Sequence, residues 1–334
     1  MNEFRGQSDT TKTNPGFEEV VNLRFGRRDA LRGALAAAAL AALPPVFRPA
    51  PARAETGAGA SPAPFSFTEI SRGVDGAHHV APGYAADVFL RWGDPITPAA
   101  PPFDPRRQTA AAQELQFGYN CDYIGFVPLG ADRGLLCVNH EYTIPRLMFP
   151  GLLNADGSFN MAAYTPQMAD IELAAHGVSV VEVKRRGAGW EVVPDSMRNR
   201  RITTRSTPFL LTGPAAGHPR LQTKADPKGR HVIGTLNNCA GGVTPWGTYL
   251  SGEENFDGYF GGRLPEGHPE ARAYFDYGIG ARPSSRFALI QKRFDVSHEP
   301  NEANRFGWVV EIDPHDPTST PKKRTALGRF KHEG

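Results

Sequence analysis

Glycine and proline recur along the whole chain and limit the length of any regular element. The 334 residues include 36 glycines and 30 prolines, together about a fifth of the chain. Both are unfavourable inside helices, because glycine loses more freedom on folding and proline cannot donate the helical hydrogen bond. We therefore expect turns and short strands around one large or two small hydrophobic cores.

Runs of apolar and β-branched residues stand between these turn signals. Val178–Val183 (VSVVEV) has the composition and partial alternation of a half-buried strand. One helix is expected over Thr165–Ala175, because Thr165 can cap it and Pro166 suits its first position. The expected strands are Ala85–Trp92, Tyr123–Leu129, Gly134–His140, Val178–Arg185, Trp190–Pro194, His231–Leu236, Tyr249–Glu253, Trp308–Asp313 and Thr325–Lys331.

Three segments follow one pattern without a fixed period. GLLCVNHEYT, GTYLSGEENF and GWVVEIDPHD each run from glycine through apolar residues to a carboxylate. Short strands with acidic ends at irregular spacing favour an all-β fold, a β-propeller with long insertions. A β-sandwich is the alternative.

The N-terminus has the features of an export signal. Arg27 and Arg28 form a twin-arginine pair, and the alanine-rich run Gly33–Leu43 is too short to anchor the chain in a bilayer. Ala52-Arg53-Ala54 suits signal cleavage. We interpret residues 1–54 as a Tat signal, 55–64 as a linker and 65–334 as the folded domain. This predicts export by the Tat translocase to the periplasm or beyond, with no stable membrane anchor. An ordinary alanine-rich helix is the alternative.

The net charge limits the kinds of binding partner to expect, and the number of cysteines limits the possible disulfides. The formal net charge of +2 gives no reason to expect a nucleic acid or an anionic membrane as partner. The three cysteines leave at least one thiol unpaired. Cys121 and Cys137 flank a predicted turn, Gly130–Gly134, and either pair across it or remain separate thiols. Cys239 is the odd cysteine in both cases.

Cys239 lies in a segment that suggests metal chemistry. Asn238 precedes it, and the run Ala240–Gly242 lets the backbone approach a ligand closely. A thiolate binds metal ions. Glu253 and Glu254 follow a predicted strand, where adjacent side chains point to opposite faces, so one of them can reach Cys239. A small buried cysteine in a tight turn is the alternative.

Other carboxylates end predicted strands or lie in loops. Glu141 follows an apolar strand, Glu302 lies in an acidic and amide-rich loop, and Glu333 follows the last predicted strand. Such oxygen ligands suit calcium, although the loop lacks the EF-hand pattern. The sequence contains no GxGxxG, P-loop, HExxH, GxSxG or CxxC motif, so a nucleotide-binding or serine-hydrolase function has no support.

At these motifs the chain resembles the PhoX family of bacterial alkaline phosphatases, from about Phe65 to Gly334. The resemblance implies a six-bladed propeller with insertions and the hydrolysis of phosphomonoesters at a centre of iron and calcium ions. Its marks are FGYNCDYIGFVPL (Phe117–Leu129), LLCVNHEYT (Leu135–Thr143), AAHGVSVVEV (Ala174–Val183), NNCAGGVTPWGTYLSGEENF (Asn237–Phe256), NRFGWVVEIDP (Asn304–Pro314) and GRFKHEG (Gly328–Gly334).

The resemblance also implies roles for particular residues. Cys239 and Glu333 match iron ligands of the family. Glu141 and Glu302 are our calcium candidates, and Glu253 or Glu254 would support Cys239. An arginine would spread the charge of the transition state, and the candidates are Arg305 and Arg329.

The chain departs from the family pattern in its length. Family members are longer and take further ligands from their C-terminal half, so we expect an incomplete propeller with little phosphatase activity by itself. Two other functions stay open. One is a propeller fragment that binds calcium without turnover, and the other is a calcium-dependent lactonase or phytase-like hydrolase.

Overall fold

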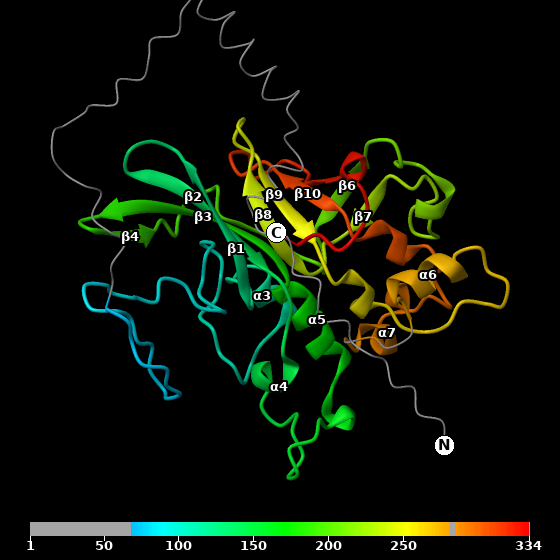
Figure 1. Cartoon of the computed structure of the whole chain (residues 1–334), viewed down its shortest axis with the longest axis horizontal. Coiled ribbons are helices and arrows are strands. Elements are labelled where there is room, and N and C mark those ends of the chain that lie inside the picture. The colour runs from blue at the N-terminus through cyan, green and yellow to red at the C-terminus, as the bar shows by residue number, and fades with distance from the viewer. Residues whose placement is uncertain (1–67, 281–282, 284, 334) are drawn as a thin grey trace, which may run out of the picture. The chain divides into compact units, whose positions relative to one another are not determined.

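The computed structural model describes residues 68–333 except 281, 282 and 284. The chain divides into two units, Met1–Ala85 and Ala86–Gly334, and the described helices and strands all lie in the second (Figure 1). The predicted Tat signal (1–54) and linker (55–64) lie outside the described residues. In the part of the chain that is described, no helix has the length and apolar character needed to cross a membrane.

The first sheet is antiparallel and is built around β3, which is buried over most of its length. Its order is β1-β2-β3-β4, and β5 also pairs with β3. Residues 177–183 of β3 are all buried, because apolar side chains cover both faces of the sheet. The bounds are β1 Cys121–Pro128, β2 Arg133–His140, β3 Gly177–Arg186, β4 Gly189–Val192 and β5 Arg200–Ile202.

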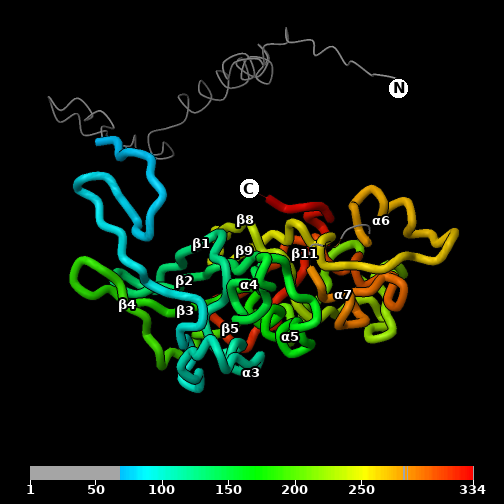
Figure 2. The backbone as a smooth tube through the Cα atoms, turned by 90° about the horizontal axis from the view of Figure 1, so that it is seen from below, coloured from blue at the N-terminus to red at the C-terminus, as the bar shows by residue number. Residues whose placement is uncertain are grey.

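The second sheet has the order β7-β6-β11-β10-β9-β8. Its pairs are antiparallel except β6 with β11, which run parallel. Edge strand β8 packs against edge strand β1 of the first sheet, so the two sheets meet along these strands (Figures 1 and 2). The bounds are β6 Pro208–Thr212, β7 His231–Ile233, β8 Asn238–Val243, β9 Tyr249–Glu253, β10 Val309–Ile312 and β11 Lys322–Arg324.

The expected helix is confirmed as α5, Pro166–Ala175, and the Thr165 side chain accepts a hydrogen bond from the Met168 amide. Its buried face packs into the main core. The other helices are short: α3 Ala110–Gln113, α4 Pro145–Met148, α6 Ala271–Tyr277 and α7 Phe287–Ile290. Single 3-10 turns occur at Met161–Ala163, Pro219–Leu221, Phe256–Tyr259, Lys292–Phe294, Glu302–Arg305 and Thr325–Leu327.

The mostly-sheet character is confirmed, and three local expectations are wrong. Ala85–Trp92 forms no strand, since no neighbouring strand supplies a hydrogen-bonding ladder. Thr325–Lys331 forms a 3-10 turn that ends at Gly328, whose φ of 85° breaks an extended chain. Val178–Val183, expected as a half-buried strand, is buried on both faces in β3. Strand β8, Asn238–Val243, lies outside the expected strands. The described strands form two open sheets, and the six-bladed count stays a prediction.

The predicted hairpin is confirmed as β1 and β2, but its cysteines do not pair. Cys121 lies opposite His140, and Cys137 lies opposite Gly125. Both thiols are free. The register places them at different levels of the hairpin, which excludes a disulfide between them.

Candidate metal centre

Two β-bulges shape the line along which the sheets meet. In β1, the pairing register shifts by one residue between Cys121 and Ile124, around Asp122. In β8, a similar shift lies between Asn238 and Gly241, around Cys239. A bulge bends a strand and redirects its side chains. The two bulges thus bring the Asp122 carboxylate within 3.6 Å of the Cys239 Sγ atom.

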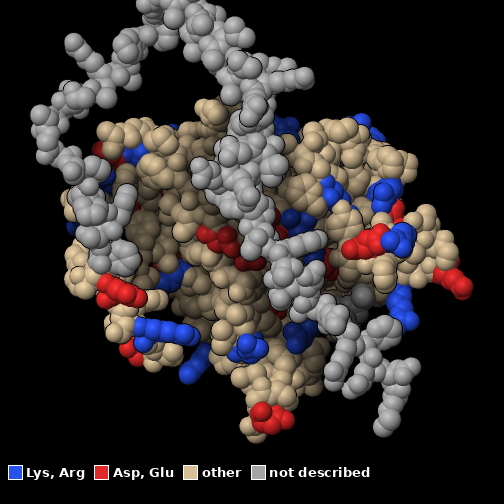
Figure 3. All heavy atoms as spheres, in the orientation of Figure 1, with Lys and Arg blue, Asp and Glu red and all other residues tan. Residues whose placement is uncertain are grey.

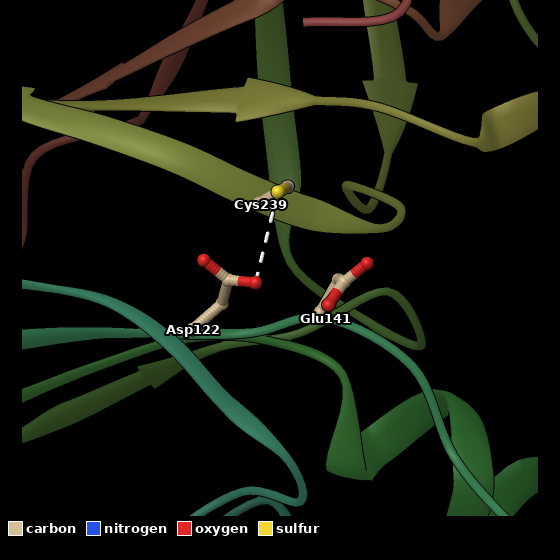
Figure 4. Close-up of side chains that lie close together, drawn as sticks. All are labelled: Asp122, Glu141 and Cys239. Atoms are coloured by element: carbon tan, nitrogen blue, oxygen red, sulfur yellow. Dashed lines mark hydrogen bonds between the residues drawn. The ribbon is translucent and has the colours of Figure 1, made fainter. Parts of the chain in front are cut away.

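Glu141 completes a group of three possible ligands. It follows β2, and its amide donates to the Asn120 carbonyl oxygen at 3.1 Å. The ligand atoms of Asp122, Glu141 and Cys239 all lie within 4.8 Å of one another. Their side chains face a shared space between β1 and β8 (Figure 4). Figure 3, in the orientation of Figure 1, shows acidic side chains gathered at the centre of the visible face, over β1.

The sequence pattern identifies Glu141 and Cys239 as candidate ligands but does not identify Asp122. Asp122 lies inside the string FGYNCDY, which marks the family resemblance without indicating a ligand. An acidic residue at the start of a strand is a weak signal. It becomes a candidate ligand only through the bulge in β1 and the neighbouring β8, and neither has a recognisable sequence pattern.

The group carries negative charge that no described cation balances. Burial, the hydrogen bond to Asp122 and the charges of Asp122, Glu254 and Glu333 raise the pKa of Glu141 to about 7. Burial and neighbouring carboxylates raise the pKa of the Cys239 thiol to about 12. Among the described residues, no lysine or arginine forms an ion pair with Asp122 or Glu141. A polyvalent cation would reverse both shifts, since it favours thiolate and carboxylate. The donor set therefore fits a metal ion.

Contacts beside the two bulges hold these ligands in place. The Asn139 side chain, opposite the β1 bulge, donates to the carbonyl oxygens of Cys239 at 2.6 Å and Ala240 at 3.2 Å. Opposite the β8 bulge lies Gly252, where a Cβ atom would come within 2.7 Å of the His332 Cβ. The absence of a side chain at Gly252 lets His332 pack there, and this brings the following Glu333 near Glu141.

Tyr259 connects the backbone segments that contain the ligand candidates Glu141, Cys239 and Glu254. Its hydroxyl oxygen lies 2.9 Å from His176 Nε2 and 3.3 Å from the Glu141 carbonyl oxygen, and it accepts a hydrogen bond from Asn237 Nδ2. Asn237 has a left-handed φ of 47°. Its carbonyl oxygen accepts from the Glu254 amide at 2.9 Å. Tyr259 thus connects the backbone at Glu141 with the segment that precedes Cys239.

Comparison with known proteins places this chain in a family. The family model described as alkaline phosphatase PhoX matches residues 65–334. The chain belongs to the PhoX alkaline phosphatase family. A solved structure of Pseudomonas fluorescens PhoX in complex with vanadate, a transition state analogue, is similar with 44% identity and a TM-score of 0.69. The similarity covers 76% of this chain and 43% of that chain. Among curated proteins, none matches significantly.

Glu253, one of the predicted ligands, is part of the core. Both side chains of the Glu253–Lys323 ion pair are fully buried, with 2.7 Å between Nζ and Oε1. The Glu253 carboxylate also accepts hydrogen bonds from Thr235, Leu236, Gly307 and Trp308. Its oxygens are therefore occupied. Of the adjacent glutamates, Glu254 is the one whose charge acts on Glu141 and Cys239.

Three further candidates, Glu302, Arg305 and Arg329, have buried partners in other parts of the fold. Glu302 is buried and paired with Arg293 and Arg305, both at 2.9 Å. Arg329 donates to the carbonyl oxygens of Phe306 and Ala303, both at 2.8 Å. No described contact connects Glu302, Arg305 or Arg329 with the three clustered ligands, because each is already engaged by its own buried partners.

The Tyr259 hydroxyl offers a test of this arrangement. We expect Tyr259→Phe to weaken metal binding by at least about 10-fold, since loss of an outer-shell hydrogen bond typically costs 10- to 100-fold. Metal retained after dialysis against graded chelator would measure it. Tyr274→Phe is the matched control, because Tyr274 is also buried and its hydroxyl donates to the Pro300 carbonyl. Equal retention by both variants would argue against a role for Tyr259.

Proposed function

We propose that this chain hydrolyses phosphomonoesters at a centre of iron and calcium ions. The observation that carries the proposal is that the Cys239 thiol, at the β8 bulge, meets the Asp122 carboxylate at the β1 bulge and the Glu141 carboxylate after β2 in a PhoX family member. Thiolates suit iron, whereas carboxylates suit calcium and iron alike. We therefore assign Cys239 and Glu333 to iron, and Asp122, Glu141 and Glu254 to the surrounding ions.

The chemistry of the substrate suits these ligands. When bound, the ions supply the positive charge that offsets repulsion between a phosphate dianion and an oxygen nucleophile. The chain's own part is to hold that charge in one place. The bulges fix Asp122 and Cys239, and Asn139 ties the two sheets together beside them.

Binding and turnover test the proposal together. We expect the chain loaded with iron and calcium to bind vanadate and to release phosphate from p-nitrophenyl phosphate, and Asp122→Asn to weaken both. Binding is needed as a second measurement because the chain spans 43% of the length of the solved PhoX chain. If the loaded chain neither bound vanadate nor released phosphate, the proposal would fail.

We also propose export through the Tat pathway to the periplasm or beyond. The support is the pair Arg27 and Arg28 before a short alanine-rich run. Fractionation of cells that express the full chain should find it outside the cytoplasm. The double variant Arg27→Lys/Arg28→Lys should stay inside, and normal export of that variant would contradict the proposal.

A further inference from the structure

A cavity of about 490 Å³ begins at Glu141 and extends away from the ligand group to α7. This is far more space than a phosphate group needs and lies within the range of sites for small organic ligands. Aromatic rings form much of its wall. They belong to Tyr142, Tyr164, Tyr259 and Phe287.

The carboxylates that line this cavity already have partners. Glu141 belongs to the ligand group. Glu172 is buried and accepts hydrogen bonds from the Thr143 hydroxyl at 2.5 Å and the Tyr164 hydroxyl at 2.6 Å. Asp257 lies 3.0 Å from Lys331 Nζ in an ion pair.

Arg286 is the arginine of this cavity. Burial raises the pKa of Glu172, and the charge of Arg286 opposes this rise without a direct ion pair among the described residues. Its guanidinium lies 3.7 Å from the centre of the Phe159 ring, and its Nε atom donates to the Met161 sulfur at 2.9 Å. Stacking of this kind fixes the plane of an arginine. Within the described part of the chain, no carboxylate forms an ion pair with Arg286.

A second polar group at the same wall lacks a partner. The hydroxyl oxygen of Ser285 is buried and makes no hydrogen bond among the described residues. Buried polar atoms are nearly always paired with protein, water or ligand. An oriented guanidinium beside an unused hydroxyl matches an oxyanion, because arginine binds carboxylate and phosphate through two parallel donors.

We propose that the cavity binds the organic part of a phosphomonoester that carries a second oxyanion, and that Arg286 and Ser285 bind this second group. The inference rests on the proposed function, because the first phosphate must lie at the metal centre. The second group is a carboxylate or another phosphate. Esters with an uncharged organic part would lack this contact.

Non-hydrolysable phosphonates test the proposal without turnover. The metal-loaded full chain should bind 6-phosphonohexanoate at least about 10-fold more tightly than hexylphosphonate, the range expected for a charge-assisted hydrogen bond. Calorimetric titration measures both. Arg286→Gln should remove the preference, and Arg286→Lys should keep part of it. Arg272→Gln, which changes an exposed arginine paired with Asp276, should keep the full preference.

The possible failures are distinguishable. Equal binding of the two phosphonates by the unchanged chain, or a preference that survives in Arg286→Gln, would overturn this inference and leave the proposed function standing. If neither phosphonate bound the metal-loaded chain, the proposed function would fail and this inference with it. A preference that inorganic phosphate abolishes by competition would support the placement of the phosphonate group at the metal centre.

Discussion

Replacing Cys239 by serine should weaken metal binding by more than about 100-fold, beyond the 10- to 100-fold typical of outer-shell residues. The sulfur is the soft donor of the group, and its bulge aims it at Asp122. A serine hydroxyl is a hard, neutral donor and would leave the carboxylates without a soft partner for iron. Metal content after reconstitution, measured by mass spectrometry, gives the result directly.

A second free cysteine, Cys121, supplies a control for this experiment. Cys121 is an exposed free thiol on the neighbouring strand, so Cys121→Ser should retain metal like the unchanged chain. If Cys239→Ser kept its full metal content, Cys239 would be a structural cysteine, which is the alternative that its sequence leaves open. Loss of metal in both variants would instead indicate a general effect on the fold.

Replacing Lys323 by methionine should destabilise the fold by about 3–5 kcal/mol, the usual cost of removing one partner from a buried ion pair. Lys323 and Glu253 are fully buried. The lysine Nζ also donates to the Arg305 carbonyl oxygen at 3.1 Å and lies 3.8 Å from the centre of the Phe306 ring. Its loss would leave an uncompensated carboxylate in the core. Urea denaturation of the metal-free chain measures the change in the free energy of unfolding.

A double variant tests whether the loss of stability comes from the unpaired Glu253 charge. In Glu253→Gln/Lys323→Met the buried charge is gone, so the loss of stability should be smaller than the sum of the single losses. Arg272→Met, in an exposed pair with Asp276, should have no measurable effect. If Lys323→Met were as stable as the unchanged chain, Glu253 would not depend on Lys323 for its charge and could take another role.

Local sequence patterns were enough for the helix and for the central strands. Thr165 and Pro166 act within one turn, so they identify the start of α5. The β-branched run Val178–Val183 predicts a strand and forms part of β3, although it is buried on both faces and not on one face as its alternation suggests. Cys239 and Glu141 can also be identified as candidate ligands from the sequence. Cys239 is an unusual donor in a glycine-rich segment, and Glu141 is a carboxylate at the end of a strand, so neither requires knowledge of its neighbours in space.

Tertiary structure decided the roles of the other charged residues. Asp122 meets Cys239 across 117 positions of sequence, and Lys323 meets Glu253 across 70. A carboxylate has the same chemistry in every sequence motif, and its role depends on the charge that folding places beside it. Glu253 forms a buried ion pair with Lys323, whereas the charge of its neighbour Glu254 acts on Glu141 and Cys239. The sequence thus determined which donors were present, and the packing of β1 against β8 determined which of them share one site.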